Sequence, residues 1–379
     1  MNVRSLGQVA DIERDGVDPN ALVEGTPYLG MENVTSDGEL VDVRTVAAGE
    51  LDSAKFTFGP EHILFGKLRP YLKKIAQPGF AGICSTELVP IRPKSGITTR
   101  YLYHFLRWQK TVDWATSLCA GANLPRLNPS MLATLPVPVP ELAVQEAFAT
   151  TLDHLDSVRR KQRQALALID ELVRATFLEM FGDPVANPRR WGVARLGEVG
   201  VLDRGKSQHR PRNDPALLGG AHPLIQTGEV ANSEGEITTF TQTYSDLGLA
   251  QSRIWPAGTL CITIAATIAK TGVLKFDACF PDSVVGFRPA ERATTEFVQA
   301  WLFFLQPIIE ARAPQVAQRN INLEILRELE LPVPPIEMQR QFARHVMAIR
   351  EAKRRLLSLT DSAEALFASL QDRAFAGSL

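Results

Sequence analysis

A long internal repeat constrains the possible folds of this chain more than any other feature. The segment Pro138-Val139-Pro140 recurs as Pro332-Val333-Pro334, and Phe181 recurs as Phe375. Both pairs have the same separation (334 − 140 = 194 and 375 − 181 = 194), so the match continues without gaps through the segment between them. A repeat of this period indicates duplicated domains and not a solenoid of short units. We therefore expect two halves of one design.

Length and composition agree with an ordinary globular protein. The chain has 379 residues, enough for two or three domains, with 45% hydrophobic and 22% charged residues. The sequence has neither an apolar run long enough for a membrane span nor a signal peptide at its start, so we expect a cytoplasmic protein. The four cysteines have no Cys-x-x-Cys spacing, which favours reduced thiols and no metal site. Because the net charge is −1, any nucleic-acid-binding surface would have to be local.

The segments outside the strong repeat have the pattern of β-rich domains. Short apolar stretches at Tyr28–Met31, Ile63–Phe65 and Glu87–Ile91 are strand candidates, and glycine and proline separate them densely. Residues Tyr101–Lys110 have the spacing of an amphipathic helix. Residues 184–328 repeat the plan of residues 1–134 in weaker sequence, so the two domains are expected to share a scaffold and to differ in their loops.

Each repeated segment predicts one long helix. The extended Pro-Val-Pro stretch is followed by about forty residues without an internal proline or glycine, which would form a rod of roughly 60 Å. Neither rod can bury its apolar stripe alone, so we expect an antiparallel coiled-coil pair. Two unrelated helices, each on its own domain, are the alternative. The predicted fold is α+β, with two β-rich domains (1–134 and 184–328) separated by the helix segments 135–183 and 329–379. The residues predicted to pair the helices or bind partners are Gln145, Phe148, Leu152, Leu155, Ile169, Leu172, Gln339, Phe342, Val346, Ile349 and Leu366.

This arrangement resembles the specificity subunit of Type I restriction–modification systems. The resemblance is strongest at Leu135–Phe181 and Leu329–Phe375, where a Pro-Val-Pro and Gln-x-x-Phe-Ala opening precedes each long helix. It implies that each target-recognition domain binds one half of a bipartite, asymmetric site in double-stranded DNA. It also implies that the helices space the domains and dock two methyltransferase subunits, which carry the S-adenosylmethionine. A motor and nuclease subunit would join through the complex, and this chain would hold no cofactor and have no catalytic residues.

Polar and basic residues in the predicted loops are the candidates for DNA contact, because arginine, lysine, asparagine and glutamine bind phosphates and base edges. In the first domain they are Lys67, Arg69, Lys73, Lys74, Asn123 and Arg126. In the second they are Arg204, Lys206, Gln208, His209, Arg210, Arg212, Lys270, Gln318, Arg319 and Asn320. We expect the loop Gly205–Arg212 to touch DNA. The alternative for each residue alone is a solvated surface charge.

Two other functions fit parts of the sequence. Residues Gly200–Ser207 match the letters of a phosphate-binding loop, which would suggest an ATP-binding enzyme. Pro211 and Pro215 interrupt the helix that such a loop requires, so we interpret the match as coincidental. The other alternative is an adaptor whose two domains bind proteins and not DNA. Salt-dependent, sequence-specific DNA binding would distinguish these possibilities.

Overall fold

The computed structural model describes residues 2–121, 123–209, 211, 214–265, 268–312 and 321–376, and it divides the chain into two compact units. Unit 1 comprises Met1–Arg163 and Ser358–Leu379, and unit 2 comprises Gln164–Leu357. Across the described residues, no helix is both long and apolar enough to cross a membrane.

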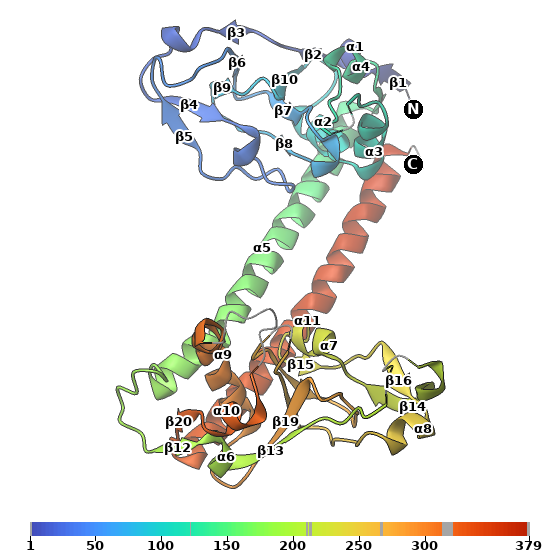
Figure 1. Cartoon of the computed structure of the whole chain (residues 1–379). Coiled ribbons are helices and arrows are strands. Elements are labelled where there is room, and N and C mark those ends of the chain that lie inside the picture. The colour runs from blue at the N-terminus through green and yellow to red at the C-terminus, as the bar shows by residue number, and fades with distance from the viewer. Residues whose placement is uncertain are drawn as a thin grey trace. The chain divides into compact units, whose positions relative to one another are not determined.

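Unit 1 is built mainly from short strands in three sheets (Figure 1). A four-stranded sheet has the order β2-β10-β7-β8, a five-stranded sheet the order β3-β6-β9-β4-β5, and β1 pairs with β11. The strands are β1 (Asn2–Ser5), β2 (Ala10–Ile12), β3 (Gly16–Val17), β4 (Thr26–Leu29), β5 (Arg44–Val46), β6 (Lys55–Phe58), β7 (Ile63–Gly66), β8 (Ile75–Ala76), β9 (Gly82–Cys84), β10 (Leu88–Pro93) and β11 (Pro136–Val139).

Short helices connect these strands and cover the four-stranded sheet. They are α1 (Leu6–Val9), α2 (Thr99–Leu106), α3 (Gln109–Ser117) and α4 (Pro129–Leu132). The helix expected at Tyr101–Lys110 is thus two helices, because the chain turns at Arg107 and Trp108 before α3 begins. The strands expected at Ile63–Phe65 and Glu87–Ile91 are present as β7 and as β10, which starts at Leu88. The strand expected at Tyr28–Met31 is present only in part, because β4 ends at Leu29 and Met31 begins a 3₁₀ turn.

Unit 2 repeats the central sheet of unit 1. Its order β13-β19-β17-β18 matches β2-β10-β7-β8, and β19 starts 196 residues after β10 (284 − 88 = 196). A fifth strand, β15, joins this sheet, while β12 pairs with β20 and β14 with β16. The strands are β12 (Val193–Arg195), β13 (Gly200–Arg204), β14 (Leu218–Leu224), β15 (Glu236–Ile237), β16 (Gln242–Tyr244), β17 (Leu260–Thr263), β18 (Thr271–Leu274), β19 (Val284–Pro289) and β20 (Glu330–Pro332). The helices within this unit are α6 (Leu196–Val199), α7 (Thr227–Ala231), α8 (Asp246–Ala250), α9 (Thr295–Arg312) and α10 (Leu323–Arg327).

The two predicted long helices are present as α5 (Leu142–Phe181) and α11 (Ile336–Phe375). The boundary between the units falls within both helices, whereas the repeat assigns each whole helix to one segment. In unit 1 the start of α5 and the end of α11 share a core with α2. This core contains Leu152, Phe367 and Phe375. In unit 2 the end of α5 and the start of α11 share a core with α9. This core contains Phe177 and Phe342. Each domain therefore packs on parts of both long helices.

Candidate nucleic-acid interface

In unit 1 the structure joins two loops that the sequence separates by about fifty residues. The turn after β7 runs alongside residues 123–127, because Arg69 N–H donates to the Pro125 carbonyl (2.8 Å) and Leu127 N–H donates to the Lys67 carbonyl (2.9 Å). The Arg69 Nη2 atom also donates to the Asn123 carbonyl at 3.3 Å. Four of the predicted DNA-contacting residues, Lys67, Arg69, Asn123 and Arg126, therefore belong to one surface, which we call the unit 1 basic loop pair.

The turn in this loop pair has a strained backbone. Arg69 and Lys73 both have left-handed backbone conformations, with φ of 50° and 54°. Such conformations are uncommon for residues other than glycine and concentrate where function requires a defined loop shape. Between them Tyr71 and Leu72 are exposed, at 50% and 37%. The sequence prediction did not include these two residues, although an aromatic residue between basic ones is a signal for nucleic-acid binding.

The side chains of Lys73 and Lys74 have different surroundings from the other predicted DNA-contacting residues of unit 1. The Lys74 Nζ atom donates to the Met31 carbonyl at 2.6 Å. Burial lowers the pKa of the Lys73 ammonium, and the nearby Arg107 guanidinium lowers it further. Arg126 is held by Glu87, whose carboxylate oxygens both lie 3.3 Å from its Nε. Arg69 and Lys67 are therefore the better placed cations of unit 1 for a phosphate.

In unit 2 the segment after β13 forms a polar loop at a different place in the scaffold, because β13 corresponds to β2 and the counterpart of β7 is β17. Gln251 fixes it, because its side-chain oxygen accepts from the N–H groups of Gln208 (2.6 Å) and His209 (2.9 Å). Lys206 is exposed, and its carbonyl accepts from the Ser252 hydroxyl at 2.9 Å. Arg204 Nε donates to the Asp282 carbonyl at 2.8 Å. Three more predicted residues, Lys206, Gln208 and His209, therefore lie in one loop, and Arg204 ends the strand before it. Whether this loop contacts DNA stays a prediction.

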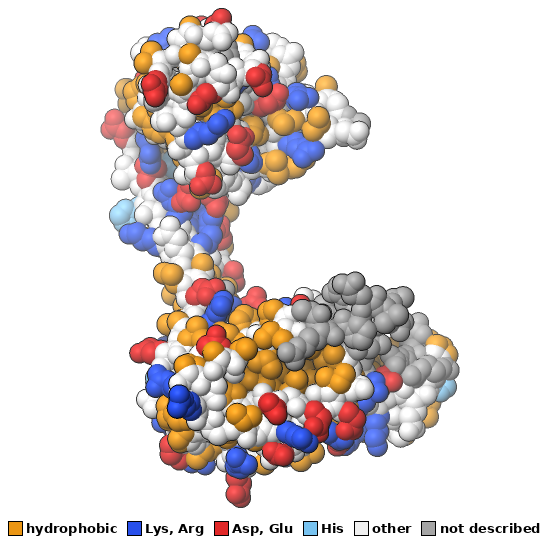
Figure 2. All heavy atoms as spheres, turned by 60° about the vertical axis from the view of Figure 1, so that its left-hand side comes forward, with side chains coloured by type: hydrophobic (Ala, Val, Ile, Leu, Met, Phe, Trp, Pro, Cys, Tyr) orange, Lys and Arg blue, Asp and Glu red, His pale blue; other side chains and the backbone are white. Residues whose placement is uncertain are grey.

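Lys270, the remaining candidate of unit 2 that the structure describes, lies outside this loop. Lys270 lines a cavity of about 460 Å³ beside α9, together with Glu296, Phe303 and Arg350. Hydrophobic side chains gather on the surface of unit 2 that Figure 2 shows. The predicted contacts at Arg210, Arg212, Gln318, Arg319 and Asn320 lie outside the described residues.

The segment that matches a phosphate-binding loop has a different structure. Gly200–Arg204 is strand β13, paired antiparallel with β19, and Gly205 N–H donates to the Val284 carbonyl at 2.9 Å. A phosphate-binding loop needs free backbone N–H groups ahead of a helix N-terminus. Here these residues are part of a sheet, and the next regular element is the 3₁₀ turn Pro215–Leu217. The geometry therefore agrees with the interpretation of the motif as coincidental.

Two glutamines fasten the long helices to their domains in the same way. The Gln145 side chain accepts from Thr98 N–H (2.9 Å) and donates to the carbonyls of Gly96 (3.0 Å) and Pro140 (2.9 Å). Gln339 accepts from Thr294 N–H (3.0 Å) and donates to the carbonyls of Arg292 (3.0 Å) and Pro334 (2.9 Å). Both glutamines are fully buried. Their amides therefore join each domain to the first turn of its long helix.

The other residues predicted to pair helices or bind partners divide by burial. Leu152, Phe342 and Val346 are buried in the domain–helix cores, and Phe148, Leu155, Ile169 and Ile349 are partly buried. Leu172 and Leu366 are about half exposed, at 46% and 50%. These two side chains are available to a partner, and their role stays a prediction.

The sequence and the fold of this chain are similar to those of known proteins. The family model described as Type I restriction modification DNA specificity domain matches residues 1–168 and 188–353, one copy in each half of the chain. The Type I restriction enzyme EcoDI specificity subunit of Escherichia coli is 29% identical over 179 residues. That alignment covers 46% of this chain and 40% of the relative, so the chain spans two fifths of that protein's length.

Other similarities extend over the whole chain. The putative type I restriction enzyme MjaX specificity subunit of Methanocaldococcus jannaschii is 22% identical over 383 residues, covering 92% of this chain and 86% of the relative. Among solved structures, the S subunit from M. genitalium aligns with a TM-score of 0.65 at 14% identity, covering 99% of this chain and 96% of the other. A chain from a structure of complex assembly and conformational transition in the type I R-M system aligns with a TM-score of 0.61 at 21% identity, covering 98% and 97%. The fold is shared across these proteins.

Proposed function

This chain belongs to the Type I restriction–modification DNA specificity family, and we propose from that premise that it directs a DNA methyltransferase complex to a split DNA sequence. Each unit would bind one half of a bipartite, asymmetric site. The observation that carries the proposal is the duplication itself, because two matched domains of one scaffold have different polar loops. Two DNA-binding domains that share a fold and differ in their loop residues suit two different half-sites.

The unit 1 basic loop pair supports this function. Lys67 and Arg69 supply cations, Asn123 an amide and Tyr71 an exposed ring, all from segments fastened by backbone hydrogen bonds. Preorganised loops of this kind lose little conformational entropy on binding. In unit 2 the loop around Lys206, held by Gln251, has the same character. The overall charge of −1 is compatible with DNA binding because these basic groups are local.

We further propose that the chain itself is not catalytic. Its exposed apolar residues on the long helices, Leu172 and Leu366 among them, would dock two methyltransferase subunits that bind S-adenosylmethionine. A motor and nuclease subunit would join through that complex. The proposal places the chain in the cytoplasm, where its DNA substrate lies. The adaptor alternative has no specific observation in its favour.

The test is methylome sequencing of cells that express this chain with the methyltransferase subunit of the same system. We expect a new split motif that disappears when this chain is left out. Replacing Lys67 and Arg69 by alanine should weaken modification through one half of the motif, and replacing Arg204 and Lys206 through the other. A stable complex with the methyltransferase that gives no new modification would contradict the DNA-recognition function.

A further inference from the structure

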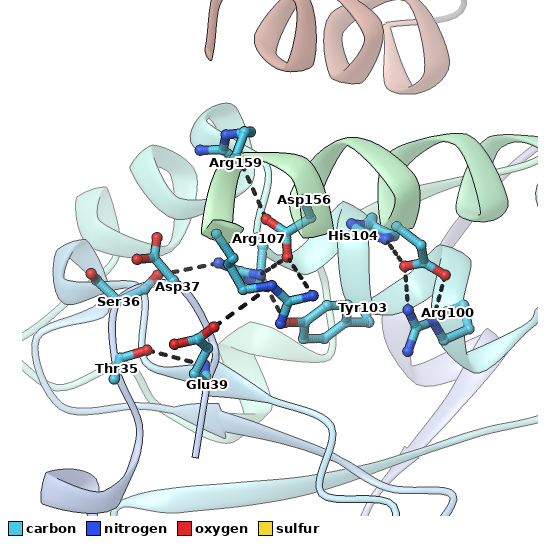
Figure 3. A network of polar contacts seen from close by, with 12 residues as sticks. Thr35, Ser36, Asp37, Glu39, Arg100, Tyr103, His104, Arg107, Asp156 and Arg159 are labelled. Atoms are coloured by element: carbon cyan, nitrogen blue, oxygen red, sulfur yellow. Dashed lines mark hydrogen bonds and ion pairs between the residues drawn. The ribbon is translucent and has the colours of Figure 1, made fainter. Parts of the chain in front are cut away.

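The side chains between α2 and α5 form a buried polar network in unit 1, shown in Figure 3. Asp156 of α5 is only 3% exposed and lies 3.8 Å from Arg107 Nη1, which donates to the Tyr103 hydroxyl at 2.7 Å. One turn earlier, Asp153 accepts from His104 Nε2 (2.6 Å) and Arg100 Nε (2.9 Å). At this level the long helix contributes both carboxylates and the β-rich domain contributes Arg100, His104 and Arg107, while Arg159 and Arg160 of α5 itself lie 3.2 and 3.6 Å from Asp156.

Unit 2 has the opposite arrangement at the same level. Arg350 of α11 donates through Nη2 to the Gln299 side-chain oxygen at 2.7 Å, and its Nη1 lies 3.4 Å from Glu236. The exposed fractions of the Arg350 and Glu236 side chains are only 18% and 14%. Glu296 of α9 also acts electrostatically on Arg350. Here the long helix contributes Arg350 and Arg354 and the domain contributes the carboxylates, while Lys275 of the domain itself lies 2.9 Å from Glu236.

The repeat shows that these positions correspond. Arg350 follows Asp156 by the helix offset (350 − 156 = 194). Gln299 follows Tyr103, and Glu296 follows Arg100, by the domain offset (299 − 103 = 196 and 296 − 100 = 196). We call these two sets the unit 1 junction (Arg100, Tyr103, Arg107, Asp153, Asp156) and the unit 2 junction (Glu236, Glu296, Gln299, Arg350). The charge is therefore reversed at two pairs of equivalent positions, Asp156 and Arg350 on the long helices and Arg100 and Glu296 on the domains, whereas the position equivalent to Arg107 is Phe303 (107 + 196 = 303).

The reversal is confined to this level of the helices. Further along α5, Arg160 and Arg163 contact Glu39 and Asp37 of the domain. In unit 2, Lys353 of α11 likewise contacts Glu234, so at this next level both helices present bases to acidic loops. These outer pairs are more exposed, and exposed pairs contribute little. The reversed pairs are the buried ones, where an uncompensated or like charge is most costly.

We propose that this charge reversal restricts each β-rich domain to its own long helix. The surface around Asp156 accepts a domain that presents arginine, and the surface around Arg350 accepts a domain that presents a carboxylate. If domain 1 were placed on α11, Arg107 would face Arg350. If domain 2 were placed on α5, Glu296 would take the position of Arg100 beside Asp153. Repulsion in the wrong pairing is an effective source of specificity. The inference concerns assembly of the chain and does not depend on DNA binding.

The first test reverses one charge in the full-length chain. Asp156→Arg places a fourth cation beside Arg107, Arg159 and Arg160. We expect amide hydrogen exchange in α2 to accelerate on the order of 100-fold, with α9 unchanged. Adding Arg107→Glu should recover at least about tenfold of that acceleration, because it recreates the unit 2 polarity. Glu146→Arg makes the same charge change at an exposed position of α5 and should leave exchange in α2 unaltered. No rescue by Arg107→Glu would contradict the proposal.

The second test transplants a domain. Leu6–Thr134 replace Leu196–Glu328 in the full chain, with and without Arg350→Asp. We expect Arg350→Asp to raise the melting temperature of the transplanted chain and to lower that of the parent, where Glu236 exchanges one of its three basic partners for a carboxylate and keeps Lys275 and Arg354. Opposite signs for one substitution would support the charge reversal as the determinant of pairing. Equal stability of the two transplants, or the same sign in both backgrounds, would overturn it. If neither transplant folds, the charge-reversal pair in the parent chain decides the question.

Discussion

The two domain–helix junctions begin alike and then diverge. At the first turn, Gln145 and Gln339 make the same three hydrogen bonds to equivalent backbone groups. Two to three turns later, Asp156 of one helix corresponds to Arg350 of the other. Hydrogen bonds to the backbone require no particular partner side chain, so either domain can satisfy the same glutamine. A buried charge requires an opposite charge, so it can distinguish the domains. The comparison teaches that one duplicated scaffold can combine a common attachment with selective contacts.

The largest expected difference between the units concerns one repeated phenylalanine. Phe342 is completely buried, with its ring centroid 5.6 Å from that of Phe177 and 5.5 Å from that of Phe181. Its counterpart Phe148 is only partly buried at the edge of the unit 1 core. We expect Phe342→Ala to cost about 3–5 kcal/mol of unfolding free energy in unit 2, and Phe148→Ala about 1–2 kcal/mol in unit 1.

Hydrogen exchange followed separately in α9 and α2 would measure these two costs. Equal losses would mean that the aromatic cluster of unit 2 adds nothing beyond simple burial. Leu168→Ala is a suitable control, because Leu168 is 72% exposed on α5.

A smaller loss of stability is expected at the two glutamines, and the loss should be the same in both units. Either Gln145→Ala or Gln339→Ala leaves a buried N–H group and two carbonyls without their partner, at a cost of about 1–3 kcal/mol. Because the hydrogen bonds match in number and length, the two losses should agree closely. Thermal melts of each variant, with exposed Gln164→Ala as control, would test this. Markedly different losses would show that the attachment is not equivalent in the two units.

The pH dependence should differ between the junctions. Burial lowers the pKa of His104 and outweighs the opposing effect of Asp153, whereas the equivalent position in unit 2 is Ala300. A lowered imidazole pKa favours the neutral form in the folded state, so the contribution is complete above the unfolded value of about 6.5 and is lost as the pH falls below it. We expect the free energy of opening of unit 1 to fall by at most about 1.4 kcal/mol for each pH unit in that range.

The Asp153 carboxylate of the same junction affects stability at lower pH. Burial alone would raise the pKa of Asp153, but hydrogen bonds from His104 and Arg100 lower it overall. Its stabilising contribution is therefore present above about pH 4 and is lost as the pH falls further. Exchange in α2 and α9 at pH 7.5 and 5.5 would isolate the histidine effect, which His104→Gln should remove. An unchanged pH response in that variant would contradict the assignment to His104.

The smallest effect is expected in DNA binding by a single loop cation. Lys206 is exposed beside a loop that Gln251 fixes, so Lys206→Ala should weaken binding and reduce the salt slope by about 1. Fluorescence anisotropy over a series of salt concentrations would measure it. Lys110→Ala removes an exposed lysine that pairs with Asp372 at the other end of the sequence, and its slope should match the parent. An unchanged slope for Lys206→Ala would remove this lysine from the interface.

Local patterns account for the parts of the fold that were predicted well. The long helices α5 and α11 follow from about forty residues of helical apolar spacing without proline or glycine after the Pro-Val-Pro stretch. The break between α2 and α3 was missed because the apolar spacing continues across Arg107 and Trp108, and nothing local marks the turn. The grouping of Arg69 with Asn123 was also out of reach, since it depends on backbone pairing between distant loops.

The duplication, the two long helices and the family resemblance could be predicted without a structure, because periodicity and repeated residues are properties of the chain alone. Which charges face one another depends on the tertiary fold. Asp156 and Arg350 both lie on solvent-compatible helical sequence, next to the repeated basic clusters at 159–161 and 353–355. Their burial arises from α2 and α9, which lie about fifty residues earlier in the chain. A charge is costly or stabilising according to the groups that surround it in space, and sequence spacing does not encode those neighbours.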